Sequence, residues 1–312
     1  MLSYQVDKTI HIAQPAQTIL TFLADFKNWP SWSPWVIQEP DCPLSYAGEQ
    51  GQVGCGYDWN GTLIGAGGMT LTVVAQNRLE MALNFLKPFK SSAKITFAVS
   101  EDETGCLVTW TMSSQVPWFL FFLKGLFKRL IGMDFQRGLL MLKSQLETGA
   151  VHSKVDVLGQ QPWPATEYIG FKGQASIKDL GPVMRAHYER LNAFMAEHNI
   201  QASGAPFALY QRMNMKTTVS DFISCIPVAT KDIAQAPADM VRGQLPACNS
   251  FVIRHTGEYP YLGNAWATAM SASRFYKVKI KRVPMGIERY ENDPLQTPAR
   301  DLVTDVVLLT KA

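Results

Sequence analysis

The 312-residue sequence predicts an α+β protein built from two successive units, residues 1–150 and 151–312. Three observations lead to this prediction. Short segments of alternating apolar and polar residues, separated by turn residues, fill most of the first unit and are typical of an antiparallel sheet. A long amphipathic stretch closes that unit and predicts a helix of many turns. The second unit contains a weak internal repeat, in which each half runs from strand to helix to strand.

The first unit begins with the alternating segment "MLSYQVDKTIHI", which predicts a strand and no signal peptide. The next segment, "QPAQTILTFLADFKNW", predicts a helix, because Pro15 suits a first helical turn and an apolar stripe follows it. A loop rich in Gly and Pro is expected over roughly residues 38–56. The strands expected after it are "GYDWNG", "GMTLTVVAQ", "RLEMALNFL", "AKITFAVS" and "CLVTWTM".

The closing helix of this unit is predicted over about residues 118–147, and its apolar face needs a large apolar partner, for which the sheet is the candidate. Lys124, Lys128 and Arg129 interrupt its most hydrophobic part. We therefore do not expect a transmembrane helix, which needs about 20 predominantly apolar residues. The linker between the units is placed near residues 149–153, because "KVDVL" has the pattern of a first strand; the stretch "LGQQPWPATEY" shows no periodicity.

The repeat in the second unit relates "YIGFKGQA" to "VIRHTGEY", two apolar strands with a glycine near the end. A helix is predicted after each of them, over about residues 179–199 and 261–277. Each helix leads through a proline to a strand that carries a tyrosine, Tyr210 in the first half and Tyr290 in the second. An apolar strand then closes each half. The pattern indicates a duplicated αβ unit.

Glu288 lies in the second of these tyrosine strands. A strand alternates its faces, so Glu288 and Tyr290 point the same way. When Tyr210 is aligned with Tyr290, Ala208 stands at the position of Glu288. A small apolar residue at the equivalent position predicts that both side chains point inward.

A carboxylate in that place has a chemical consequence. Buried without a partner it is costly, so it takes a proton or waits for a cation. Aromatic faces add a cation–π attraction of about 0.5–2 kcal/mol per ring. The pattern suits a ligand that is apolar, flat and positively charged, and the candidate ligand-binding residues are Glu288, Tyr290, Trp266, Tyr210, Tyr259 and Tyr261. The alternative interpretation is a salt bridge to Arg212 or Arg289, or exposure to solvent.

Three tryptophans stand close together in "NWPSWSPW": Trp29, Trp32 and Trp35. Tryptophan is costly to expose, so three in seven residues need a common apolar partner. Either they close the core at one end of the first sheet, or they form the rim of a cavity between that sheet and the long helix. The sequence leaves both interpretations open.

Composition excludes several classes of function. The net charge is +3 and no Lys or Arg run exceeds a pair, which is too weak for a nucleic-acid partner. The five cysteines form no C-x-x-C and the five histidines have no ligand spacing, so we expect no metal site, disulfide framework or cofactor. Signatures of P-loop, G-x-S-x-G and H-E-x-x-H enzymes are missing.

Over roughly residues 152–312 the sequence resembles a GyrI-like (gyrase-inhibitor-like) effector-binding domain. The resemblance rests on "HTGEY", on Trp266, on "IERYENDP" and on the closing "TDVVLLT". In that family a glutamate at the floor of a cleft between the two repeats neutralises cationic lipophilic ligands. The resemblance places this role on Glu288, with Tyr290 and Trp266 as walls, and implies that some members use the glutamate as a general base in hydrolysis.

Over about residues 1–148 the sequence resembles the START-like superfamily of the polyketide cyclase/dehydrase type (SRPBCC). The matching pieces are "IHIAQPAQTILTFLADFKNWPSWSPW", "DWNG" and "GMDFQRGLLMLKSQLE". The resemblance implies a helix-grip fold, in which an antiparallel sheet curls around the long C-terminal helix and encloses an apolar cavity. Members bind lipids, hormones or polyketides, and a few are enzymes.

These observations predict a cytoplasmic protein that binds small apolar or cationic molecules and acts as a sensor or a sequestering factor. The expected partner is a small ligand, with no direct nucleic-acid contact and no membrane partner. One alternative is a hydrolase of reactive small molecules with Glu288 as general base, favoured by a pKa that burial among aromatic rings raises. A second alternative is a gyrase-inhibitor-like interaction protein. Whether the chain is an enzyme stays open at this point.

Overall fold

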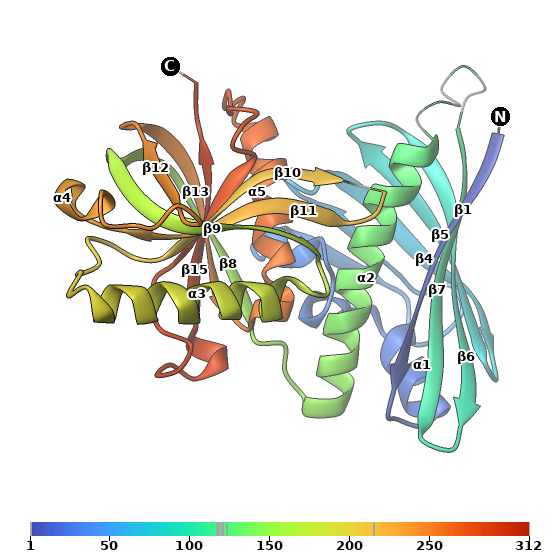
Figure 1. Ribbon diagram of the computed structural model, residues 1–312. Coiled ribbons are helices and arrows are strands. Elements are labelled where there is room, and N and C mark those ends of the chain that lie inside the picture. Colours follow the sequence, from blue (N-terminus) through green and yellow to red (C-terminus); the bar gives the residue numbers. More distant parts are fainter. Residues whose placement is uncertain (1, 117–118, 120–121, 123, 215, 312) are drawn as a thin grey trace. The chain divides into compact units, whose positions relative to one another are not determined.

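The computed structural model describes residues 2–116, 119, 122, 124–214 and 216–311 (Figure 1). The chain divides into two compact units, Met1–Val151 and His152–Ala312. Each unit combines antiparallel strands with helices, so the predicted α+β class is confirmed. No helix among the described residues is both long and apolar enough to cross a membrane.

Among the described residues, the strands of the first unit form a seven-stranded sheet in the order β1-β7-β6-β5-β4-β3-β2. Neighbouring strands pair antiparallel, as the alternating pattern predicts. The short β2 lies inside the stretch expected to be a loop, because its four residues pair with β3. The strands are β1 Leu2–Ile12, β2 Leu44–Ala47, β3 Gly56–Asn60, β4 Ala66–Ala75, β5 Arg78–Lys87, β6 Ser91–Asp102 and β7 Gly105–Val116.

Helices follow the first strand and close the unit: α1 Ala16–Ala24, the 3-10 helices η1 Phe26–Ser31 and η2 Val36–Gln38, and α2 Lys124–Thr148. The helix expected from about residue 118 is described from Lys124 onward, since residues 117–118, 120–121 and 123 lie outside the described part. Helix α2 packs on β1 and β7. At their contact the rings of Phe135 and Trp110 stack 4.0 Å apart, which confirms that the long helix lies along the sheet.

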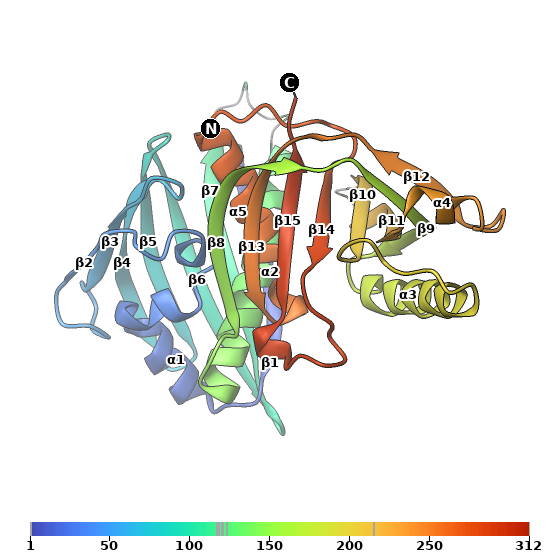
Figure 2. The same cartoon turned by 90° about the vertical axis from the view of Figure 1, so that its left-hand side faces the viewer.

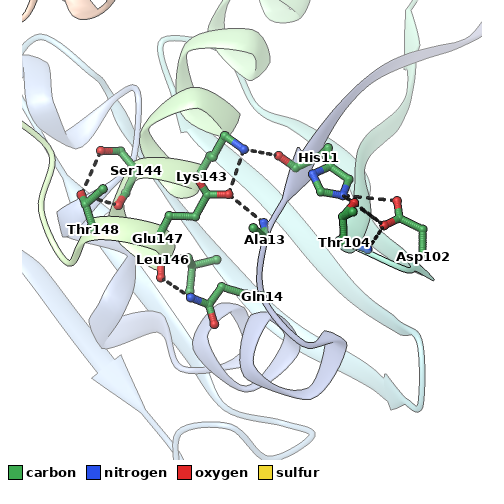
Figure 3. Close-up of polar contacts among 10 residues, drawn as sticks. All are labelled: His11, Ala13, Gln14, Asp102, Thr104, Lys143, Ser144, Leu146, Glu147 and Thr148. Carbon is green, nitrogen blue, oxygen red and sulfur yellow. Dashed lines mark hydrogen bonds and ion pairs between the residues drawn. The ribbon is translucent and has the colours of Figure 1, made fainter.

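The C-terminal end of α2 is fastened to the end of β1 (Figure 3). Lys143 Nζ donates to the backbone oxygen of His11 at 2.7 Å and to Glu147 Oε1 at 2.8 Å. The same Glu147 oxygen accepts from the backbone N–H of Ala13 at 2.7 Å. Beside them, Asp102 in the β6–β7 turn accepts from the hydroxyl of Thr104 at 2.8 Å. The charged groups Lys143, Glu147 and Asp102 therefore lie close together where β1 and α2 end, and each has a hydrogen-bond partner there.

The strands of the second unit form, within the described residues, an eight-stranded sheet in the order β12-β9-β11-β10-β14-β15-β13-β8, part of which faces the viewer in Figure 2. The strands are β8 Ser153–Trp163, β9 Thr166–Ser176, β10 Phe207–Asn214, β11 Val219–Pro227, β12 Val241–Leu245, β13 Cys248–Gly257, β14 Gly286–Tyr290 and β15 Val303–Leu309. The helices are α3 Leu180–Glu197, α4 Thr230–Ile233, η4 Tyr259–Tyr261, α5 Gly263–Phe275 and η5 Ala299–Asp301.

The strand order shows the duplication. The first repeat runs β8-β9-α3-β10-β11 and the second runs β12-β13-α5-β14-β15. Exchanging each element for its counterpart and reversing the sheet order gives the same order again. The sheet therefore has a pseudo-twofold axis between β10 and β14. The first strand of each repeat forms the edge of the other half, since β8 pairs with β13 and β12 pairs with β9.

The stretch "LGQQPWPATEY", which looked irregular, belongs to β8 and β9. Its lack of periodicity has two local causes. Leu158 has no partner on β13, because Gly159 pairs with Val252 and the preceding Val157 with Ile253, so a bulge interrupts the alternation. Pro162 is tolerated because β8 is an edge strand, where a missing N–H costs no ladder bond.

The second sheet has a different core on each face. One face holds an apolar cluster that includes Phe207, Ile287 and Val307. The other face is covered by α3 and α5, and a cluster around Ala208 and Tyr210 joins side chains of both helices there. This helix-covered face is the one on which the candidate site lies.

Candidate functional site

Glu288 lies in β14 on the helix-covered face and is only 6% exposed. Its strand pairs with β10, where Ala208 stands directly opposite. The inward orientation predicted from strand parity and from the repeat is therefore confirmed. The alternative of simple exposure to solvent is wrong.

Three side chains donate hydrogen bonds to the Glu288 carboxylate. The indole Nε1 of Trp266 lies 2.6 Å from Oε1. The hydroxyl groups of Tyr210 and Tyr290 each lie 2.9 Å from Oε2. All three donors are neutral, so they solvate the carboxylate without cancelling its charge.

The local sequence explains why the indole reaches this oxygen. Trp266 stands near the start of α5, above Gly286 of β14. A Cβ on Gly286 would lie 2.6 Å from the indole ring carbon Cη2. The absence of a side chain at Gly286 thus leaves room for the indole ring. Glu288, two residues further along the same face of the strand, accepts the hydrogen bond from the ring nitrogen.

Aromatic rings surround the carboxylate. The ring of Tyr210 packs edge-on against Trp266, with centroids 5.4 Å apart. Tyr290 packs edge-on against Tyr188 of α3 and against Tyr259, each at 6.0 Å. The two repeats contribute in parallel, since each helix supplies one ring that packs on the tyrosine strand of the other half.

Tyr188 and Met184 were not expected at this site. The Tyr290 hydroxyl also approaches Met184 Sδ, at 3.5 Å, and the Tyr188 hydroxyl is buried. Both lie on α3 four residues apart, which places them on one face of the helix. That spacing, on the helix equivalent to the one that carries Trp266, is the signal in the sequence that could have found them.

Burial sets the protonation of the group. Desolvation raises the pKa of Glu288, while the hydrogen bonds from Trp266, Tyr210 and Tyr290 oppose the rise. Burial and the nearby Glu288 charge together raise the pKa of both tyrosine hydroxyls well above the ordinary value. The tyrosines therefore stay protonated as donors throughout the neutral range.

The salt-bridge interpretation of Glu288 is wrong. Arg212 pairs with Asp221 at 3.0 Å. Arg289 points to the opposite face and pairs with Asp305 at 2.8 Å and with Glu291. Within the described part of the chain, Glu288 forms no ion pair with a lysine, arginine or histidine.

The other two tyrosines of the expected set lie at different depths. Tyr259 is 38% exposed and rests on Tyr290; burial, with the charges of Glu288 and Asp293, raises its pKa to about 12. Tyr261 is buried in η4 before α5. Among the described residues it is not one of the side chains that hydrogen-bond to Glu288.

In the first unit Trp29 and Trp32 are buried, and Trp35 is partly buried. Trp29 and Trp32 lie 4.8 Å apart, and Trp32 and Trp35 both pack edge-on against Trp110 of β7. This packing is what a core position requires. The buried indole N–H groups of Trp32 and Trp110 have no acceptor among the described residues, whereas Trp29 donates to the backbone oxygen of Leu23.

The arrangement around Glu288 can hold a positive charge against aromatic faces, or hold a proton. The described His, Cys, Asp and Glu residues include no group of three or more that could bind a metal ion. The chemistry available at this place is therefore that of one carboxyl group in an apolar, aromatic environment.

Comparison with solved structures gives distant likenesses. A Chromobacterium violaceum protein is 12% identical, with a TM-score of 0.36 over 46% of this chain and 96% of its own. The di-domain ARO/CYC StfQ of the steffimycin biosynthetic pathway is 11% identical, with a TM-score of 0.39 over 47% and 51%. EcmrR in its DNA complex is 14% identical, with a TM-score of 0.44 over 62% and 70%. A search of curated proteins gave no match.

Family models match both units. Residues 3–147 match the family described as polyketide cyclase / dehydrase and lipid transport, and residues 161–310 match the GyrI-like small molecule binding domain. Together they support a role in binding small molecules. The chain thus joins a START-like domain of the polyketide cyclase/dehydrase type to a GyrI-like small-molecule-binding domain.

Proposed function

We propose that the second unit binds a small apolar cation through Glu288, and that the protein acts as a sensor or a sequestering factor for such molecules. One observation carries the proposal. The Glu288 carboxylate is buried and accepts hydrogen bonds from three neutral donors, yet forms no ion pair with a described residue. Its negative charge is solvated and still uncompensated.

A cation beside this carboxylate gains in two ways. It offsets the desolvation that raises the pKa of Glu288, and it meets the faces of aromatic rings, worth about 0.5–2 kcal/mol each. A carboxylate has about four lone-pair sites, of which the three donors occupy three. Trp266, Tyr259 and Tyr290 are partly exposed, and the proposed ligand would enter past them.

The alternative of hydrolysis at the same place is supported by the same raised pKa, because a general base works best with a pKa near the operating pH. The three hydrogen bonds argue against it, since they occupy three of the about four lone-pair sites with which a base could accept a proton from water. Turnover of an ester or epoxide that Glu288→Gln abolishes, with ligand binding retained, supports the hydrolase.

For the first unit we propose an apolar ligand with an acceptor oxygen. The indole N–H groups of Trp32 and Trp110 support this, because they are buried without an acceptor among the described residues. Their ring centroids lie 5.4 Å apart, so both unpaired donors belong to one aromatic cluster. Loss of binding in Trp32→Phe with the fold retained tests this assignment.

Calorimetry with a pair of flat probes tests the proposal for Glu288. N-methylacridinium carries a permanent charge, and acridine is its neutral counterpart at slightly alkaline pH. We expect the cation to bind, and Glu288→Gln to weaken it at least tenfold, which is about 1.4 kcal/mol. Asp221→Asn removes a partly exposed carboxylate on β11, two strands from β14 in the sheet, and serves as the control. Equal affinity for both probes, or an unchanged affinity in Glu288→Gln, contradicts the proposal.

A further inference from the structure

One end of the first sheet carries a surface that the ligand site does not use. The turn between β5 and β6 lies beside the end of β7, because Asn84 pairs with Ser92 and Ala93 pairs with Ser114. Leu2, at the start of β1, pairs with the last residue of β7, Val116. The chain then leads into α2. The β5–β6 turn, the start of β1 and the start of α2 therefore meet at this end.

Large apolar side chains are exposed there. Phe89 is 80% exposed in the turn, and Phe122 is 65% exposed just before α2. The exposed apolar residues of this end are Leu2, Leu86, Phe89, Phe119, Phe122, Leu126 and Leu130. Leu126 and Leu130 stand four residues apart, on one face of α2. So many neighbouring exposed apolar groups mark an interaction surface rather than scattered surface residues.

The same end is basic. Lys87 and Lys90 flank Phe89, and Lys124 and Lys128 flank Leu126. None of these four lysines is in an ion pair within the described chain. The described residues 2–6, 84–93, 112–116, 119, 122 and 124–130 contain no Asp or Glu. We call this set of residues the basic apolar end.

Some acidic groups of the unit are already held by hydrogen bonds. Glu39 reaches the neighbouring β3–β4 turn, where its oxygens accept backbone N–H groups of Thr62, Leu63 and Ile64 at 2.7–3.1 Å. Asp102 and Glu147 lie at the opposite end of the sheet (Figure 3). Asp58 of β3 lies level with Asn84, two strands away, so the basic apolar end itself, and not the whole sheet edge, is where cations and apolar groups gather without a carboxylate among them.

We propose that the basic apolar end docks the protein onto a bilayer that carries anionic lipids. Exposed phenylalanine and leucine side chains enter the interface between headgroups and acyl chains, and the surrounding lysines meet the negative surface. A second copy of the chain fits poorly, because it would set lysines against lysines. A nucleic acid would leave the apolar groups unburied. The expectation of no membrane partner rested on the lack of a spanning helix, which surface docking does not need.

Vesicle flotation of the full chain tests the proposal, with phosphatidylcholine vesicles that are pure or contain about a third phosphatidylglycerol. We expect flotation with the anionic vesicles and its loss at high salt. The double variant Lys90→Glu with Lys128→Glu lowers the partition coefficient by at least about fivefold per lysine. Phe89→Ser lowers it by about tenfold.

Two control variants make the same types of substitution, a double charge reversal and the loss of an exposed apolar side chain, outside the basic apolar end. Lys172→Glu with Lys178→Glu changes the net charge equally in the second unit, and Leu295→Ser removes an apolar group that is 92% exposed. Both should float like the wild type. All the replaced side chains are exposed, so melting temperatures stay unchanged. No flotation with anionic vesicles, or equal losses in the controls, overturns the proposal. Binding of duplex DNA through the same lysines without vesicle binding overturns it in favour of a nucleic acid.

Discussion

Ala208 lies directly opposite Glu288 in the β10–β14 ladder, and the two are also equivalent positions of the repeat. Two residues can be ladder partners and equivalent repeat positions at once only where the pseudo-twofold axis passes between them. It follows that Tyr210 and Tyr290, each two residues along its own strand, approach this pair symmetrically. Their hydroxyl groups indeed reach the same oxygen of Glu288 at the same distance, 2.9 Å. One carboxylate is thus held by one tyrosine from each half.

The first prediction concerns the pH dependence of stability. The pKa of Glu288 is raised above its ordinary 4.5 in the folded protein, so the folded state holds this proton more tightly than the unfolded chain. The resulting stability is complete below pH 4.5 and is lost as the pH rises through the raised pKa. In the absence of ligand, Glu288→Gln should therefore gain stability relative to the wild type as the pH rises.

Thermal unfolding at a series of pH values measures this difference. Above the raised pKa we expect Glu288→Gln to melt about 2–4 °C higher, which corresponds to about 1 kcal/mol in a domain of this size. Asp221→Asn is the control, because the pKa of the partly exposed Asp221 is lowered, so its stability difference from the wild type does not change with pH above pH 5. A difference between Glu288→Gln and wild type that does not change with pH would contradict the raised pKa.

A second prediction concerns the two tyrosines. Tyr210→Phe and Tyr290→Phe each remove one hydrogen bond to Oε2, and each should cost about 1.5–3 kcal/mol where Glu288 is ionised. The cost should shrink where Glu288 is protonated. Because both donors meet one atom, the double variant should deviate from additivity. Tyr276→Phe, at an exposed tyrosine of the same unit, should be neutral. Additive and pH-independent losses would show that the tyrosines act separately from the carboxylate.

A third prediction tests how the indole is placed. Gly286→Ala sets a Cβ 2.6 Å from the ring of Trp266, so the ring must move and its bond to Glu288 breaks. We expect a loss of about 1–3 kcal/mol and a change in tryptophan fluorescence. Gly181→Ala in α3 meets no atom within 4 Å and should be neutral or slightly stabilising. Equal stability of the two variants would mean that the contact with Trp266 does not matter.

The sequence was sufficient for the main features of this site. Strand parity and a repeat aligned on two tyrosines were enough to place Glu288 inward, at the repeat position of Ala208; that the two residues also pair across β10 and β14 came from the structure. The duplicated αβ pattern and the long helix of the first unit were also predictable, because their periodicities are local. What could not be predicted is the partner of each charge. Arg289 neighbours Glu288 in sequence but points to the other face, where Asp305 holds it.

The edge strand β8 shows a second limit of sequence patterns. A bulge at Leu158 and a proline at position 162 remove the period-two alternation from the second half of the strand, so that half lacked the signal of a strand, whereas "KVDVL" showed it. Its pairing with β13 depends on the exchange of first strands between the repeats. Pairing between strands that are far apart in the sequence cannot be predicted from the pattern of a short local segment.

A fourth prediction concerns the ion cluster on the opposite face. Asp305 is fully buried and pairs with Arg254 and Arg289, both at 2.8 Å. Burial alone would raise its pKa, but these bonds outweigh it and hold the pKa below 3.8. The stability from this group is therefore present above pH 3.8 and is lost as the pH falls through the lowered pKa.

Asp305→Asn should cost about 2–4 kcal/mol in denaturant unfolding at neutral pH, less than a fully dry pair because both arginines are partly exposed. Asp221→Asn breaks an exposed pair and should cost about 0–0.5 kcal/mol. The difference in the free energy of unfolding between wild type and Asp305→Asn should become smaller at acidic pH. Equal costs for the two aspartates would show that burial adds nothing to the cluster.

The last prediction compares two glycines of one helix, α2. A Cβ on Gly138 would lie 2.8 Å from the ring of Trp110 and 3.0 Å from Pro34, so the helix can approach the sheet only with glycine there. Gly138→Ala should therefore cost about 1–3 kcal/mol and disturb near-ultraviolet tryptophan signals. Gly125→Ala meets only the end of the Arg129 side chain at 3.6 Å and should gain up to about 1 kcal/mol from helix propensity. If Gly138→Ala were stabilising too, the close contact between α2 and Trp110 would not exist in solution. The helix would then lie further from the sheet than in the structure.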